Sequence, residues 1–185
     1  MTRDRDPDEV FAAAAAVGVG TVIDPAIPEA RWQTAEGIRG VADQLGAMAE
    51  RAAGHGLRLG YHNHFWELAT IVDGRPALEL FAELVDPALI LQIDTYWAAV
   101  GGQDVPALLE RLGDRVRLLH LKDGPLDGVD DHQLPIGRGT LPVWPIVRAT
   151  PALEIPIIEF DGYAGDIFEG ITAAFRYASA GPPAT

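Results

Sequence analysis

Residues 59–64 read Leu-Gly-Tyr-His-Asn-His, a short apolar run that ends in polar side chains able to bind a metal. Three later segments repeat the pattern: Leu-Gln-Ile-Asp-Thr-Tyr-Trp at 91–97, Leu-Leu-His-Leu-Lys-Asp at 118–123 and Pro-Ile-Ile-Glu-Phe-Asp at 156–161. Each apolar run is typical of a buried strand. Because α/β barrels place their chemistry at the carboxyl ends of parallel strands, four such ends in series predict one shared site.

Strand-like and helix-like periods alternate along the rest of the chain. We expect five strands, at residues 21–24, 57–62, 89–94, 116–121 and 155–160. We expect helices around and between them, at residues 8–17, 34–54, 77–85, 105–112, 144–149 and 166–178. Thr34 and Asp104 are the expected N-caps of two of these helices. Repeated βα units predict a parallel sheet with right-handed crossovers and strands buried on both faces.

An open, doubly wound sheet is the first alternative to a barrel-type fold. Such sheets usually have a glycine-rich phosphate loop after the first strand. Here the first strand is followed by Asp-Pro-Ala-Ile-Pro at 24–28, which cannot form that loop. Neither a P-loop nor a Gly-x-Gly-x-x-Gly motif occurs in the chain. The pattern therefore favours barrel-type repeats.

The composition excludes several classes of function. The chain of 185 residues has no cysteine, so neither disulfides nor thiolate metal sites are available. Its formal net charge of −13 disfavours binding to nucleic acids and to anionic membranes. The charged start is not followed by a signal peptide, and no run is long enough to span a membrane. We expect a cytoplasmic protein with a small-molecule substrate.

Asp94, His120 and Glu159 each follow a predicted buried strand. Taken singly, each of them could be a cap, a loop brace or a satisfied structural residue. Taken together, at the ends of neighbouring barrel strands, they come within reach of one ion. Carboxylate and imidazole ligands suit Mn²⁺, Mg²⁺, Co²⁺ or Zn²⁺. The set predicts a divalent metal site.

The segment Tyr-His-Asn-His-Phe-Trp-Glu at 61–67 has the highest density of polar groups. His62 and His64 point to the same side of an extended strand, because side chains alternate. His62 is a candidate fourth ligand, with His64 lining the cavity as a substrate-binding residue. Glu67 lies just beyond and could reach back. Alternatively, one histidine is structural and Glu67 is solvated.

Three further residues are candidates for contact with substrate. Lys122 faces the same side as His120, so its ammonium could stabilise a substrate oxygen or pair with a neighbouring carboxylate. Arg138, between Gly137 and Gly139, could reach a substrate anion or could simply be exposed. Trp97 offers an apolar wall, or ordinary core packing.

The order of these motifs resembles the sugar phosphate isomerase/epimerase family, within the xylose isomerase-like TIM barrel superfamily. The matching motifs are Gly-Tyr-His-Asn-His-Phe-Trp-Glu at 60–67, Asp-Thr-Tyr-Trp at 94–97, His-Leu-Lys-Asp at 120–123, Ile-Gly-Arg-Gly at 136–139 and Glu-Phe-Asp at 159–161. The superfamily also contains ketose epimerases, inosose dehydratases and isomerases, and endonuclease IV. The motifs are fairly specific for the superfamily and weak for the substrate.

The resemblance implies a divalent metal with Asp94, His120 and Glu159 as the matching ligands. Many members have a glutamate where this chain has His62, so either His62 coordinates or Glu67 substitutes. In the epimerases that first glutamate and the last one form an acid/base couple. Its absence here disfavours a symmetric two-glutamate mechanism. The Tyr-His-Asn-His-x-x-Glu variant is closer to the inosose dehydratase-like branches.

A full barrel has eight strands, whereas this sequence predicts five, and the motifs align the first of them with the fourth barrel strand. The expected fold class is α/β with incomplete TIM-barrel repeats, the N-terminal strands being missing. We expect one partial barrel domain over residues 1–180 and a disordered tail over 181–185. Open sheet edges predict self-association.

The expected function is metal-dependent isomerisation or epimerisation of a sugar, sugar phosphate or keto-polyol. A metal-chelated carbonyl would acidify the adjacent proton, Glu159 or Glu67 would move it, and Lys122 would stabilise the resulting oxyanion. An inosose dehydratase-like lyase and a non-catalytic barrel remnant remain alternatives. A repair nuclease is disfavoured by only five histidines and the acidic charge.

Overall fold

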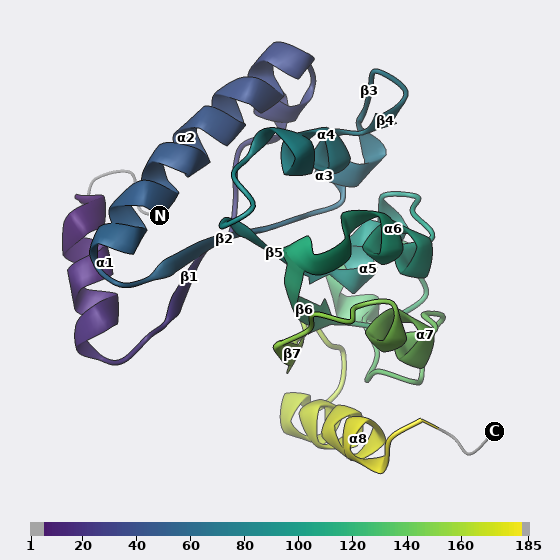
Figure 1. Ribbon diagram of the computed structural model, residues 1–185. Coiled ribbons are helices and arrows are strands. Elements are labelled where there is room, and N and C mark those ends of the chain that lie inside the picture. The colour runs from purple at the N-terminus through teal and green to yellow at the C-terminus, as the bar shows by residue number, and fades with distance from the viewer. Residues whose placement is uncertain (1–5, 183–185) are drawn as a thin grey trace. The chain divides into compact units, whose positions relative to one another are not determined.

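The computed structural model describes residues 6–182, so the first five residues and residues 183–185 of the expected tail lie outside the description. Five strands form one sheet in the order β1-β2-β5-β6-β7 (Figure 1). Their bounds are β1 Thr21–Asp24, β2 Arg58–His62, β5 Ile90–Asp94, β6 Val116–Leu121 and β7 Ile155–Ile158. The strands are parallel, which confirms the predicted α/β class of a partial TIM barrel.

The helices lie where the apolar periods place them, with small differences at their ends. Those predicted are α1 Pro7–Ala16, α2 Ala35–Gly54, α4 Ala77–Leu84, α6 Val105–Leu112, α7 Val143–Arg148 and α8 Ile167–Ala180. The N-cap predictions are confirmed, because Thr34 accepts from Gly37 N at 3.1 Å and Asp104 accepts from Ala107 N at 3.1 Å. Shorter elements were not predicted: α3 Trp66–Ala69, α5 Thr95–Val100, the hairpin of β3 Ile71–Val72 and β4 Arg75–Pro76, and the 3-10 turns η1 Glu29–Trp32, η2 Gly113–Arg115 and η3 Asp130–His132.

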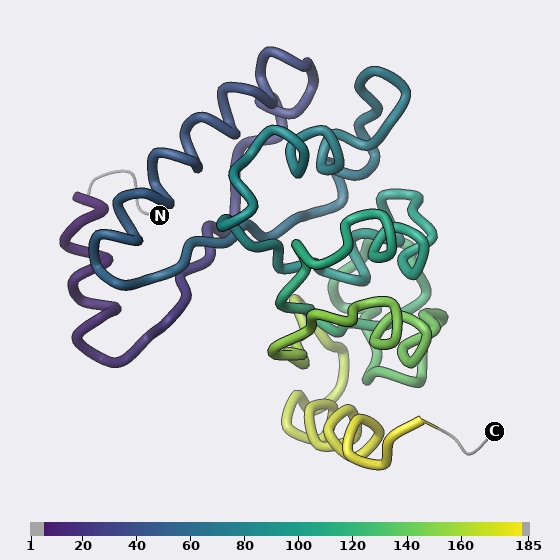
Figure 2. The backbone as a smooth tube through the Cα atoms, in the orientation of Figure 1, coloured from purple at the N-terminus to yellow at the C-terminus, as the bar shows by residue number. Residues whose placement is uncertain are grey.

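The chain divides into two compact units, residues 1–92 and 93–185, and the division falls inside β5. In the first unit, α2 buries Ile38, Val41, Ala42 and Leu45 at the spacing of one helix face. Figure 2 shows α1 running beside α2. Three fully buried aromatic rings form the centre of this unit, with centroids 5.3 to 5.5 Å apart: Trp32, Tyr61 and Phe81.

The second unit has its core between β6 and the helices α6 and α7. Buried side chains from all three elements form it: Leu108, Leu109, Leu112, Val116, Leu119 and Ile146. The expectation that every strand is buried on both faces is wrong for β7, where Ile155 is 54% exposed. In the described sheet β7 has a single neighbour, β6, and Pro156 within it is typical of an edge strand.

Within residues 6–182, none of the helices has both the length and the apolarity that a membrane crossing requires.

Candidate active site

Asp94 is fully buried at the last position of β5, where it is also the N-cap of α5. Its Oδ1 accepts hydrogen bonds from the backbone N–H groups of Tyr96, at 3.1 Å, and Trp97, at 3.0 Å. The next residue, Thr95, donates from Oγ1 to the carbonyl of His120 at 3.0 Å. These contacts fix the end of β5 against the end of β6 and leave the other carboxylate oxygen of Asp94 for a different partner.

That partner is the ammonium of Lys122, a side chain with 1% exposure. Lys122 Nζ lies 2.8 Å from Asp94 Oδ2, 3.0 Å from Glu159 Oε2 and 2.6 Å from Asp161 Oδ2. Burial alone would lower the pKa of Lys122, but the neighbouring carboxylates, Asp94 foremost, outweigh it and raise the pKa. Lys122 is therefore charged at neutral pH and links three strand-end carboxylates.

Glu159 directly follows β7 and lies between His120 and Lys122. Its Oε2 contacts His120 Nδ1 and the Lys122 ammonium. The hydrogen bond from His120, and after it the Lys122 contact, lowers the pKa of Glu159 to about 2 although partial burial acts in the opposite direction. Glu159 is thus an ionised carboxylate beside the His120 imidazole. Ionisation is what both a proton acceptor and a metal ligand require.

The low pKa of Glu159 predicts a loss of stability in acid. The folded-state pKa is about 2 and the ordinary value is 4.5. The unfolded chain therefore binds the proton first, and stability present above pH 4.5 declines as the pH falls toward 2. Because the side chain is 38% exposed, we expect a contribution of only about 1–2 kcal/mol. Urea unfolding at several pH values should show a shallower decline for Glu159→Gln than for wild type in metal-free buffer; equal slopes would contradict the assignment.

Asp161 joins this cluster, although only its position in the Glu-Phe-Asp motif hinted at it. Its Oδ2 accepts from Trp97 Nε1 at 2.9 Å, from Gln133 Nε2 at 2.8 Å and from Lys122 Nζ at 2.6 Å. Its backbone N–H donates to Gln133 Oε1 at 2.8 Å. Trp97 is therefore held by its indole N–H beside the cluster. Nothing in the local sequence singled out Gln133, which is buried by residues distant along the chain.

Asp123 organises the loop that follows β6. This fully buried carboxylate accepts four backbone N–H groups at 2.9 to 3.0 Å, from Gly124, Gly137, Gly139 and Leu141. A Cβ at position 139 would lie 2.2 Å from Asp123 Oδ1, so that position requires glycine. The backbone on both sides of Arg138 is therefore held by Asp123, the residue that follows Lys122.

Glu67 and His64 lie in the first unit and contact each other. Glu67 is fully buried, and its carboxylate accepts from the Tyr61 hydroxyl and, at 2.8 Å, from the backbone N–H of His64. Burial, and after it the Glu67 charge, raises the pKa of Tyr61, so the phenol stays protonated and donates. The His64 ring stacks on Trp66 with centroids 4.1 Å apart. The Glu67 carboxylate therefore stabilises the conformation of residues 61–67, to which it belongs.

Replacing Tyr61 by phenylalanine should destabilise the protein by roughly 2 kcal/mol, because Glu67 loses a buried donor. Urea unfolding measures the change. The double-mutant cycle with Glu67→Gln provides the control, since the second substitution should cost less in the Tyr61→Phe background than alone. Strictly additive effects would show that the hydroxyl does not support Glu67.

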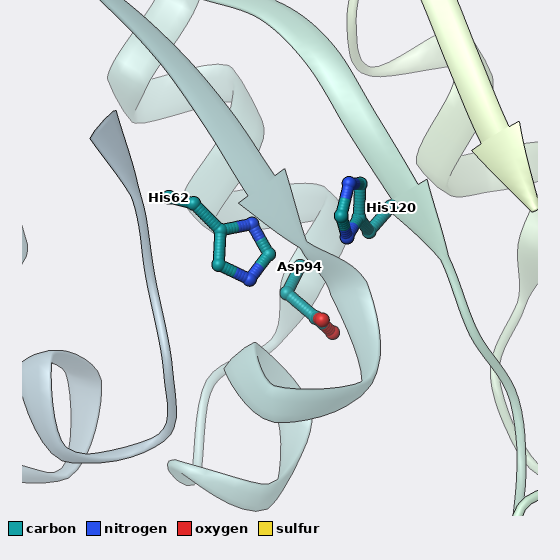
Figure 3. Close-up of side chains that lie close together, drawn as sticks. All are labelled: His62, Asp94 and His120. Carbon is teal, nitrogen blue, oxygen red and sulfur yellow. The ribbon is translucent and has the colours of Figure 1, made fainter. Parts of the chain in front are cut away.

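His62 is the last residue of β2 and pairs in register with Gln92, two residues before Asp94 on β5. One potential ligand atom from each of His62, Asp94 and His120 lies within 4.8 Å of the others (Figure 3). Two ligands of one ion at metal distances of 2.0 to 2.2 Å are at most about 4.4 Å apart, so the observed spacing is close to the one that a shared ion requires. Two imidazoles and a carboxylate form a donor set that suits Zn²⁺, Mn²⁺ or Co²⁺. Glu159, the other predicted ligand, contacts His120 without belonging to this set.

The strand order and these strand-end side chains define a partial α/β barrel with a metal-competent site at the carboxyl ends of its strands. The chain belongs to the xylose isomerase-like TIM barrel family, whose model matches residues 7–150. This confirms the family indicated by the motifs.

Individual relatives are similar over part of their length. Inosose dehydratase from Geobacillus kaustophilus is 41% identical over 69 residues, which are 37% of this chain and 21% of that enzyme. A sugar phosphate isomerase/epimerase from Parabacteroides distasonis shares the fold with a TM-score of 0.81 at 20% identity, over 95% of this chain and 64% of that one. A structure of the IolI protein with a bound zinc atom has a TM-score of 0.66 at 13% identity, over 94% of this chain and 66% of that one. The chain thus spans less than two thirds of these relatives.

Proposed function

We propose that this protein catalyses a metal-dependent isomerisation or epimerisation of a sugar or keto-polyol, by proton transfer next to a chelated carbonyl. The observation that supports it is the convergence of Asp94, His120, Lys122 and Glu159 at neighbouring strand ends. His62, Asp94 and His120 are the proposed ligands, with Glu159 next to them. A bound divalent cation would supply Lewis acidity to the substrate carbonyl.

Glu159 is the proposed base. It is ionised, and its Oε2 is held by His120 and Lys122, so it can accept a proton from a carbon placed beside it. Lys122 is the proposed stabiliser of the oxygen that gains charge, because its ammonium stays protonated and is kept in place by Asp94 and Asp161. Trp97 and His64 remain proposed substrate contacts. For Glu67 we propose a positioning role through Tyr61 and His64 in place of direct proton transfer.

The direct test detects proton exchange. Ketoses, sugar phosphates and inososes are incubated with purified protein and Mn²⁺ in D₂O, and incorporation of deuterium next to the carbonyl is followed by NMR. We expect exchange that requires the metal and is lost in Glu159→Gln. Arg148→Gln serves as the control, since Arg148 is the last residue of α7 and, within residues 6–182, forms no ion pair with the carboxylates of the cluster. Exchange unchanged by Glu159→Gln, or absent with every substrate, would refute the proposal.

An inosose dehydratase-like reaction is the second candidate. The segment 41% identical to such an enzyme favours it, as does the histidine at the position of the usual first glutamate. The same residues would remove the proton, and a hydroxyl would then leave as water. Mass spectrometry distinguishes the two reactions, because only the dehydratase product is lighter than its substrate by one water.

A partial barrel that binds metal without turnover is the remaining alternative. The chain spans 64% of the Parabacteroides distasonis structure, and β7 leaves one edge with an exposed isoleucine. Association through such an edge is consistent with this reading. Metal binding without deuterium exchange, in a protein that self-associates in sedimentation experiments, would favour it.

A further inference from the structure

A cavity of about 520 Å³ lies in the second unit, between the loop after β6 and one face of α8. Its polar lining comes from Arg138, Tyr163, Glu169, Thr172 and Arg176. Phe168, Thr172 and Arg176 follow each other at four-residue spacing and therefore share a face of α8. Apart from Arg138, none of these residues was singled out by the sequence, because the α8 face becomes a wall only when the loop is placed against it.

The lining is rich in donors that the protein itself does not use. Between residues 6 and 182, neither the Arg138 nor the Arg176 guanidinium forms an ion pair or a side-chain hydrogen bond, and the Tyr163 hydroxyl forms none either. Two arginines against the single carboxylate of Glu169 make the lining positive, in a chain whose formal net charge is −13. A concentration of free cationic donors against the overall charge is the arrangement that an anionic ligand requires.

The walls of this cavity are held rigidly. Gly137 lies so close to α8 that a Cβ there would be 2.3 Å from Tyr177 Cε2. Asp123 accepts the N–H groups of Gly137 and Gly139, which fixes the backbone around Arg138. The ring of Tyr163 lies against Gly170, where an added Cβ would be 2.9 Å from it. The backbone that carries Arg138 and the ring of Tyr163 are thereby held in place before a ligand binds, which favours affinity.

The cavity walls continue the segments that form the candidate active site. Arg138 belongs to the loop after Lys122 and Asp123, and Tyr163 is four residues beyond Glu159. Both therefore lie beyond the carboxyl ends of β6 and β7, where the acid–base cluster is. Arginine binds phosphate oxygens in a bidentate manner, and a hydroxyl adds a further donor.

We propose that this cavity binds the phosphate group of a phosphorylated sugar, so that the substrate class of the proposed enzyme is a sugar phosphate. The link to catalysis rests on the proposed function, whereas phosphate binding by the cavity does not. A free phosphate would use the same donors as the phosphate of a sugar. The experiment therefore compares inorganic phosphate, fructose 6-phosphate and fructose.

Isothermal titration calorimetry at fixed ionic strength is the test, with the three probes added to wild type, Arg138→Gln, Arg176→Gln and Arg148→Gln. We expect fructose 6-phosphate to bind at least tenfold more tightly than fructose, and inorganic phosphate to compete with it. Each of Arg138→Gln and Arg176→Gln should weaken this binding by about tenfold. Arg148→Gln removes the same charge from the same unit outside the cavity and should leave the affinity unchanged.

Three results would overturn the proposal: no binding of either phosphate, equal affinities for fructose and its phosphate, or equal weakening by Arg148→Gln. Binding of phosphate alone, without preference for the sugar phosphate, would overturn the assignment of substrate class. Phosphate-dependent binding without deuterium exchange would contradict the proposed function and leave the cavity assignment intact. Exchange on unphosphorylated ketoses that Arg138→Gln leaves unchanged would contradict the assignment of substrate class and leave the proposed function intact.

Discussion

Asp94→Asn is expected to lower the affinity for Mn²⁺ or Zn²⁺ by roughly 100-fold or more while the fold is retained. The substitution removes the charge of the one carboxylate in the set with His62 and His120. Asparagine is as good an N-cap as aspartate, so the hydrogen bonds to Tyr96 and Trp97 that start α5 can persist. The Lys122 ammonium loses the charge of Asp94 but keeps the carboxylates of Glu159 and Asp161 as partners.

Competition with a chromophoric chelator measures the metal affinity, and circular dichroism with thermal unfolding measures the fold. Asp104→Asn is the matched control, because Asp104 caps α6 in the same way through Ala107 N and belongs to no ligand set in residues 6–182. Metal affinity unchanged by Asp94→Asn would rule out Asp94 as a ligand. Equal loss of affinity in both variants would show a general effect of charge.

Lys122→Met should have the largest effect on stability in the absence of metal. It removes the ammonium that pairs with Asp94, Glu159 and Asp161, and so takes the cation away from the fully buried carboxylate of Asp94. Breaking a buried ion pair from one side typically costs about 3–5 kcal/mol. Because Glu159 and Asp161 are partly exposed, we expect about 3 kcal/mol, or a fall in Tm of roughly 6–12 °C.

A divalent cation should restore part of that stability, because it would neutralise the same carboxylates. Differential scanning calorimetry with and without Mn²⁺ measures this, and the increase in Tm on metal addition should be larger for Lys122→Met than for wild type. The double variant with Asp161→Asn should lose less than the sum of the single changes. An unchanged Tm in metal-free Lys122→Met would show that the ammonium does not balance these charges.

The strands and long helices could be predicted because their signals are local. Apolar runs end at Asp94 and His120, and Thr34 and Asp104 mark helix starts within a few residues of sequence. The hairpin at residues 71–76 had a local signal as well, the Asp73-Gly74 turn with both φ angles positive, but two-residue strands give no period. Local patterns were thus sufficient for the five strands of the main sheet and for the helices of eight or more residues.

Other features depended on contacts between segments distant in sequence. The bond between Tyr61 and Glu67 requires the unpredicted turn of α3, and the four hydrogen bonds of Asp123 require the whole loop to 141. Ile155 is exposed because β7 is the last strand in the order of the sheet. An apolar run in the sequence does not indicate whether its strand will lie at an edge. Arg176 could not be predicted as a cavity residue, because it shares a cavity with Arg138 only through the packing of α8. Candidate ligands were therefore easier to predict than their partners.

Lys122 is the only lysine in the chain, since the other thirteen basic residues are arginines. Its primary amine is thus, apart from a terminal one, the single target for acylating reagents. In the folded protein the side chain is 1% exposed and its amine is protonated, so modification requires the cluster to open. The rate at which an N-hydroxysuccinimide ester labels the protein would report on the dynamics of this one site, without any engineered probe. Mass spectrometry of the tryptic map could follow that opening residue-specifically as metals or sugars are added.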